Sequence, residues 1–251
     1  MPSDEIAAEL RELVPELVAI RRDVHQHPEL GFKEVRTAAL ISRSLSESGY
    51  RVQAEVGGTG VVAVLDGGAP GPTLAIRADI DALPVGELSG LPFASKNGNM
   101  HACGHDGHIA IALIAARLLA RHRKQLQGRV KFVFQPAEEI TQGALAMLGD
   151  HVFDDPEPDR VIGLHIWNQV PAGTVSVNRA TVFASADAIR ITVRGKGGHG
   201  AMPHRAVDPV VATSLIVANA QTVVSREVPP NEMGVLTFGQ VHGGSAPNVI
   251  P

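Results

Sequence analysis

Four short runs of apolar, largely β-branched residues constrain the fold of this 251-residue chain more than any other feature. They cover residues 60–65, 73–77, 129–134 and 160–165. Such runs are typical of strands that are buried on both faces of a sheet. Patterns with helical spacing surround them at 10–27, at 34–48 and at 105–122, where Ile109, Leu113 and Ala116 belong to one apolar stripe. Strands that alternate with helices predict an α/β layered domain.

The pattern changes after about residue 184. Two segments, 188–194 and 234–241, are predicted strands because of their alternation and apolar content. Between them a helix is predicted over 208–226, with Asp208 as its N-cap and Pro209 as its first residue. We therefore expect a first domain over residues 1–184 and the start of a smaller α+β domain over 185–251.

The composition argues against several classes of protein. Hydrophobic residues make up 44% and charged residues 19%, which is unlike a disordered chain. A net charge of −4 gives no reason to expect a nucleic acid or an anionic membrane as partner. The first residues are acidic where a signal peptide needs basic ones, and no apolar run is long enough to span a membrane. Cys103 is the only cysteine, so no internal disulfide can form and a cytoplasmic location is expected.

Residues with metal-binding chemistry are concentrated between His101 and His108, in the sequence HACGHDGH. A thiolate and imidazoles are good ligands for zinc and other first-row divalent metals. One alternative is a polar helix start that contains a buried cysteine. Another makes Cys103 a nucleophile and His105 its base, although the paired glutamates further along the chain would then go unexplained.

Further polar groups follow the predicted strands, where ligands bind in α/β folds. Asp79 and Asp81 come after one strand and suit the orientation of ligand histidines. Glu138 and Glu139 come after another, so that one can bind metal while its neighbour takes a proton from water. His165 ends a third strand and, taken alone, is more typical of a hydrogen-bonded core histidine. Beside the other groups, it is interpreted as a metal ligand.

The motifs HACGHDGH, QPAEE and GKGGHGAMPH, in this order, resemble the amidohydrolase branch of the M20 metallopeptidases. That branch includes hippurate hydrolases, N-acyl-L-amino acid amidohydrolases and plant auxin-conjugate hydrolases. The resemblance runs from residue 25 to residue 251 and implies an α/β fold, with a zinc-aminopeptidase-like layered catalytic domain and an inserted ferredoxin-like α+β lid domain. It also implies that the chain stops inside the lid, before a further ligand histidine.

The resemblance implies a site for two divalent metal ions, which could be zinc, manganese or cobalt. The implied ligands are Cys103, His105, Glu139 and His165. Because lids of this family often dimerise, a homodimer through residues 185–251 is also expected.

Catalytic or substrate-binding roles are implied for four other residues. Glu138 matches the general base, and Asp81 matches the acid that orients a ligand. In the lid, His199 matches a histidine that polarises the scissile carbonyl, and Asn248 matches an asparagine near the substrate. The alternative for His199 is an exposed residue in a simple glycine-rich turn.

The sequence thus predicts a metal-dependent amidohydrolase that converts an N-acyl amino acid into a carboxylate and a free amino acid. Two alternatives stay open. One is a carboxypeptidase or dipeptidase that acts on short peptides. The other is a catalytically inactive, truncated binding protein. In each case the expected ligand is a small molecule rather than a nucleic acid or a membrane.

Overall fold

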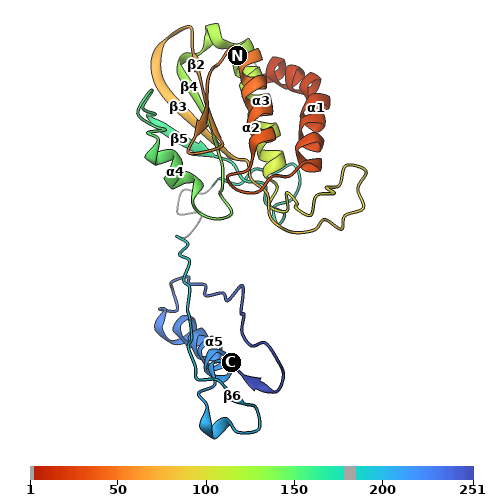
Figure 1. Cartoon of the computed structure of the whole chain (residues 1–251). Coiled ribbons are helices and arrows are strands. Elements are labelled where there is room, and N and C mark those ends of the chain that lie inside the picture. The colour runs from red at the N-terminus through yellow and green to blue at the C-terminus, as the bar shows by residue number, and fades with distance from the viewer. Residues whose placement is uncertain (1–2, 178–184) are drawn as a thin grey trace. The chain divides into compact units, whose positions relative to one another are not determined.

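The computed structural model describes residues 3–177 and 185–251, and the chain divides into two compact units, Met1–Val182 and Phe183–Pro251 (Figure 1). Among the described residues, no helix combines the length and the apolar character that crossing a bilayer requires.

The first unit is built around a five-stranded mixed sheet. Its strands are β1 (Arg51–Val56), β2 (Gly60–Asp66), β3 (Ala69–Asp79), β4 (Gln127–Gln135) and β5 (Arg160–Gly163). Their order across the sheet is β1-β2-β4-β3-β5. Strands β3, β4 and β5 are parallel, and the register pairs Asp79 with Gln135. Their carboxyl ends therefore lie at one edge of the sheet, where the polar residues identified in the sequence follow.

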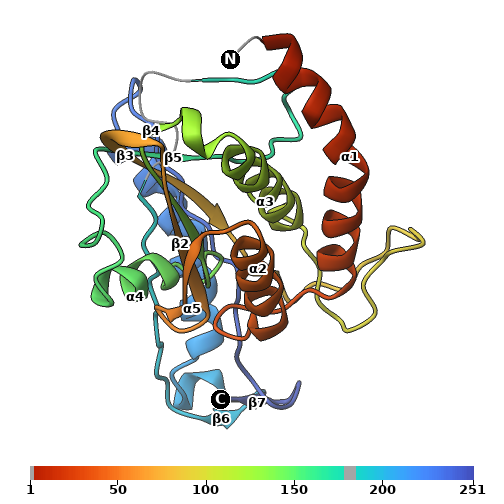
Figure 2. The same cartoon turned by 90° about the horizontal axis from the view of Figure 1, so that it is seen from above.

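Helices cover both faces of this sheet (Figures 1 and 2). They are α1 (Ser3–Gln26), α2 (Val35–Glu47), α3 (His105–Arg121) and α4 (Gly143–Gly149), with a 3-10 turn at Arg123–Gln125. Helices α2 and α3 pack on the sheet, and α1 packs against α3. The pleat of β4 assigns the faces, since Phe132 and Phe134 belong to the main core under α3 whereas Val133 packs with Met147 of α4. The predicted α/β layered fold is confirmed for this unit.

One prediction about these strands is wrong. The run at 160–165 was expected to be buried on both faces, but Arg160–Gly163 is exposed along its length. Its apolar side chains Val161 and Ile162 are 52% and 50% exposed. The reason is position: β5 is the edge strand and pairs only with β3 among the described strands.

The second unit contains one long helix and a small ladder. The helix α5 (Pro209–Thr222) continues into a π-helical turn at Val223–Glu227, and a short 3-10 turn covers Pro203–Arg205. The predicted N-cap is confirmed, since the side chain of Asp208 accepts hydrogen bonds from the amides of Val210 and Val211 at 2.8 and 3.1 Å. Strand β6 (Gly198–His199) pairs antiparallel with β7 (Val249–Ile250).

The strands predicted at 188–194 and 234–241 are wrong. Neither segment takes part in a ladder with any residue that the structure describes, and both are largely exposed. A β-branched, alternating sequence favours the extended conformation, but a strand forms only when a neighbour accepts its backbone hydrogen bonds. In this unit the described ladder is limited to β6 and β7.

Candidate metal centre

The candidate site lies where four segments of the first unit meet. Asp81 follows β3, Glu138 and Glu139 follow β4, His165 follows β5, and His105 is the first residue of α3. The parallel arrangement of β3, β4 and β5 brings the three strand ends to one edge. The start of α3 supplies the fourth segment.

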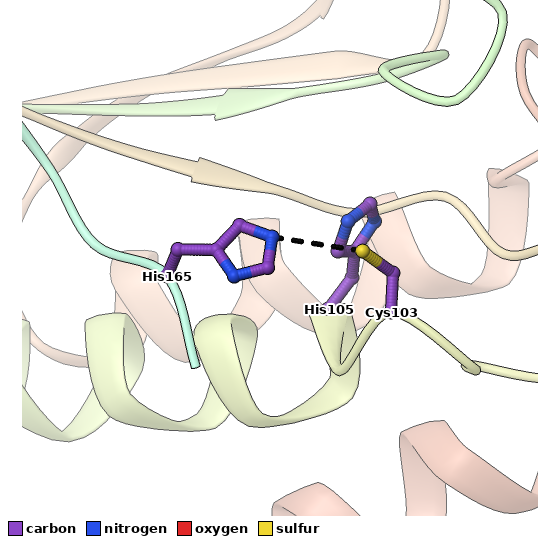
Figure 3. Close-up of side chains that lie close together, drawn as sticks. All are labelled: Cys103, His105 and His165. Carbon is purple, nitrogen blue, oxygen red and sulfur yellow. Dashed lines mark hydrogen bonds between the residues drawn. The ribbon is translucent and has the colours of Figure 1, made fainter. Parts of the chain in front are cut away.

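Cys103, His105 and His165 form the first group of potential ligands (Figure 3). Their ligand atoms all lie within 4.8 Å of one another. The Sγ atom of Cys103 is 3.6 Å from Nε2 of His165, along the dashed line of Figure 3. Between the cysteine and the helix, Gly104 adopts a φ of 88°, in the left-handed region that glycine tolerates. This turn allows Cys103 and His105, on either side of Gly104, to approach the same point.

His105 also belongs to a second group, with Glu138 and Glu139. Its Nε2 atom is 3.8 Å from an oxygen of each glutamate. Its Nδ1 atom is 2.8 Å from the backbone carbonyl oxygen of Asp81. Because a carbonyl can only accept, Nδ1 carries the proton, and in the neutral ring Nε2 presents a lone pair toward the carboxylates. That is the form in which an imidazole binds a metal.

The residues present fit a bound cation. Nε2 of His105 and Oε1 of Glu139 are both buried, and neither has a hydrogen-bond partner among the described residues. Buried polar atoms without partners are costly and rare in native proteins. A divalent cation between them would satisfy both, and a set of sulfur, nitrogen and carboxylate oxygen donors suits zinc, cobalt or manganese.

Asp81 holds two parts of this site together. Its Oδ2 atom accepts a hydrogen bond from the backbone amide of Glu139 at 3.0 Å, and its Oδ1 atom is 3.4 Å from Nδ1 of His105. The aspartate is fully buried, so these contacts are not shared with solvent. Asp81 is therefore placed where an acid could orient the ring of His105.

A further buried link joins Asp79, His108 and the loop that carries His165. Nδ1 of His108 donates to Oδ1 of Asp79 at 2.5 Å, and Nε2 of His108 accepts the backbone amide of Ile166 at 2.8 Å. Burial alone would raise the pKa of Asp79, but the hydrogen bond from His108 and the nearby charges of His105 and Arg77 hold it at about 2. Both nitrogens of His108 are thus engaged in hydrogen bonds, although His108 with Asp79 and His105 also forms a third group of potential ligand atoms.

The environment of Cys103 argues against its being a nucleophile. Burial, followed by the negative charge of Glu139, raises the pKa of the thiol to about 12. A reactive cysteine needs the opposite, a lowered pKa beside a cationic group. A metal cation would reverse this electrostatic environment, because it stabilises the thiolate directly.

The other two residues singled out in the sequence, His199 and Asn248, lie together in the second unit. His199 is in β6, and its Nδ1 atom accepts the amide of Ala201 at 3.1 Å. The backbone carbonyl of Asn248, which immediately precedes β7, accepts the amide of Gly200 at 2.9 Å. His199 and Asn248 are both exposed.

The chain is similar in sequence to proteins of known families. The family described as Peptidase family M20/M25/M40 matches residues 75–249. An N-acetyl-L-cysteine deacetylase of Bacillus subtilis is 44% identical over 96% of the chain and 58% of its own length. A hippurate hydrolase of Campylobacter jejuni is 42% identical over 97% of the chain and 63% of its own length. The chain thus spans about three fifths of the length of these relatives.

A similar fold is found in a solved structure. It is the YXEP protein of Bacillus subtilis, described as a dinuclear metal binding peptidase from the M20 family. That chain is 38% identical and superimposes with a TM-score of 0.66, over 84% of this chain and 57% of its own length.

Proposed function

Since the chain belongs to peptidase family M20/M25/M40, we propose that it provides the metal-binding part of an amidohydrolase that cleaves N-acyl amino acids. The observation that carries the proposal is the pair of buried, unpartnered ligand atoms on His105 and Glu139. The names of the two relatives support the substrate class, since both refer to the hydrolysis of an N-acylated amino acid.

The proposed site holds two divalent cations, in line with the description of the similar solved structure. The proposed ligands are Cys103, His105, Glu139 and His165. When bound, the cations would lower the pKa of a water molecule and stabilise negative charge on the carbonyl oxygen of the substrate.

Glu138 is the proposed general base. It is the more exposed of the two glutamates, with 38% of its side chain accessible against 19% for Glu139. The amide of Glu139 is also fixed by Asp81, and one of its oxygens is buried without a partner, as expected of a ligand. Glu138 is therefore free to take a proton from water and to deliver it to the leaving amine.

We assign the remaining roles to the second unit. His199 would donate a hydrogen bond to the developing oxyanion, and Asn248 would contact the substrate. The support is that both residues are exposed and that Gly200, which follows His199, donates its amide to the carbonyl of Asn248.

We further propose a homodimer through the second unit and a location in the cytoplasm. The support for the dimer is that α5 exposes apolar side chains, among them Val211 at 55% and Leu215 at 58%. The support for the location is the single, unpaired Cys103, which fits a reducing compartment. Zinc, manganese and cobalt all suit the donor set.

The decisive experiment separates the two glutamates. Glu139→Ala should lower the content of divalent metal measured by elemental analysis, because it removes a ligand. Glu138→Gln should keep its metal and lose about 10²–10⁴-fold in turnover of hippurate or N-acetylcysteine, because it removes the base. Turnover would be measured in the chain extended to the full length of its relatives. An unchanged turnover for Glu138→Gln at full metal content would contradict the assignment, and hydrolysis of dipeptides alone would point to a peptidase.

A further inference from the structure

The segment between α1 and α2 contacts both loops that carry the proposed catalytic groups. The carbonyl of Glu29 accepts the amide of Ala82 at 2.8 Å, and Leu30 forms a parallel bridge with Ala82. Glu34, five residues after Glu29, contacts Ala137. Ala82 directly follows Asp81, and Ala137 directly precedes Glu138. One segment thus contacts the loop after β3 and the loop after β4.

Glu34 makes the second of these contacts through a carboxyl group that is completely buried. Its Oε1 atom accepts the backbone amide of Ala137 at 2.8 Å, and its Oε2 atom accepts the hydroxyl of Thr59. Burial raises the pKa of Glu34, against the lowering effect of these hydrogen bonds. A carboxyl group is rarely buried so deeply in a protein unless hydrogen bonds or an ion pair compensate for its lost hydration.

The backbone that Glu34 holds is strained. Ala137 adopts a φ of 49°, in the left-handed region that non-glycine residues rarely enter. Such a conformation persists only where the surroundings fix it, and it is concentrated at functional sites. Here the carbonyl of Ala137 accepts the amides of Gln142 and Gly143, while Glu34 binds its amide. The next two residues in the chain are the proposed base and a proposed ligand.

The segment that carries Glu34 packs closely against the turn at Ala137. A Cβ atom at Gly31 would lie 3.0 Å from the Cα of Ala137 and 3.1 Å from its Cβ. The glycine therefore allows the segment to approach the turn, and the Glu34 carboxyl then binds the amide.

We infer that Glu34 is a positioning residue, which fixes the left-handed turn at Ala137 and thereby sets where Glu138 and Glu139 stand relative to His105. This inference rests on the proposed function, because it takes Glu139 as a ligand and Glu138 as the base. Glu34 acts through the backbone of the loop and touches neither substrate nor metal.

The test compares Co²⁺ binding by four forms of the chain: the unchanged sequence, Glu34→Ala, Glu34→Gln and Thr59→Val. Cobalt is the probe because a thiolate ligand such as Cys103 gives a near-ultraviolet charge-transfer band, and the visible bands report coordination geometry. Glu34→Ala should weaken Co²⁺ binding by about 10–100-fold and alter the visible bands, as expected when a group that supports a ligand is lost. Glu34→Gln should bind nearly as well as the unchanged chain, because its amide oxygen still accepts the Ala137 amide.

Thr59→Val is the matched control. It removes the other hydrogen bond of the Glu34 carboxyl, at a partly buried neighbour, but leaves the bond to Ala137 intact. A purely structural role would make Thr59→Val and Glu34→Ala alike in lowering stability, with the cobalt spectrum of the folded protein unchanged in both. A positioning role moves the spectrum and the affinity in Glu34→Ala alone.

The outcomes separate this inference from the proposed function. If the unchanged chain binds no Co²⁺ through a thiolate, the proposed metal site itself is refuted. If the unchanged chain binds and folded Glu34→Ala binds equally well, the inference about Glu34 is overturned. If Glu34→Ala does not fold, Glu34→Asp takes its place, since it keeps a carboxyl group but is one methylene too short to reach Ala137. Misfolding of both while Thr59→Val folds would assign Glu34 to general stability and overturn the inference.

Discussion

Replacing His108 with leucine tests the buried link between the sheet and the loop that carries His165. Leucine keeps the apolar bulk on α3 but removes both ring nitrogens. Oδ1 of Asp79 then loses the donor at 2.5 Å, and the amide of Ile166 loses its acceptor at 2.8 Å. Arg77, at 2.7 Å from Oδ2, remains as a partner of Asp79.

The expected loss of stability follows from these two bonds. A hydrogen bond to a charged group contributes about 1.5–3 kcal/mol, and losing an ordinary hydrogen bond at the partly buried amide of Ile166 costs about 0.5–1.5 kcal/mol. Their sum, reduced because Arg77 still binds the aspartate, predicts a loss of about 1.5–4 kcal/mol in the free energy of unfolding. For a unit of this size the melting temperature should fall by roughly 10 °C.

The assay is urea unfolding followed by circular dichroism, with a chelator present so that metal binding does not contribute. His151→Asn is the control, because the side chain of His151 is 76% exposed and its pairing with Asp154 is on the surface. Asparagine also tolerates the φ of 59° at this position. The control should stay within about 0.5 kcal/mol of the unchanged chain. A loss below about 1 kcal/mol for His108→Leu would refute the energetic account of this link, since that is the contribution of an ordinary neutral hydrogen bond.

Two predictions concern the second unit. In the chain extended to the length of its relatives, His199→Ala should keep its metal by elemental analysis and lose about 10²–10³-fold in turnover. The reason is that the histidine would stabilise charge that develops only in the transition state. Unchanged steady-state kinetics would instead favour the alternative, in which His199 is an exposed residue of a simple turn. Asp208→Ala should reduce the stability of α5 by about 1 kcal/mol, because the amides of Val210 and Val211 lose their acceptor. Hydrogen exchange of those amides measures the loss, and Asp208→Asn, which retains a cap, should exchange nearly as slowly as the unchanged chain.

Much of the first unit could be predicted because its patterns are strong and local. The run Gly60–Leu65 is apolar throughout, and all six of its residues are buried in β2. The stripe on α3 that contains Ile109 and Leu113 packs into the main core as its spacing indicates. The ends of parallel strands converge on one edge, so Asp81, Glu139 and His165 could be placed near one another before their distances were known.

Other features depend on contacts that no local pattern encodes. Glu34 is a charged residue next to Lys33, and its burial arises only when the segment packs against Ala137. Strand β1 was missed because it is short and weakly apolar: polar and apolar residues alternate in Arg51–Val56, but only Val56 is buried. The two strands predicted in the second unit failed for the opposite reason, because their sequences favour extension but the described residues offer them no partner.

The position of β4 has a consequence for how the polypeptide acquires its structure during synthesis. This strand lies between β2 and β3 in the sheet, although it emerges from the ribosome after both. Neither earlier strand can gain its central neighbour until residues 127–135 are available, so about fifty residues separate β3 from its parallel partner. Until then the apolar edges of β2 and β3 stay open to pairing with other chains. We therefore expect slow maturation and a need for chaperones in this interval, with Cys103 and the helix that follows it already synthesised but not yet in place.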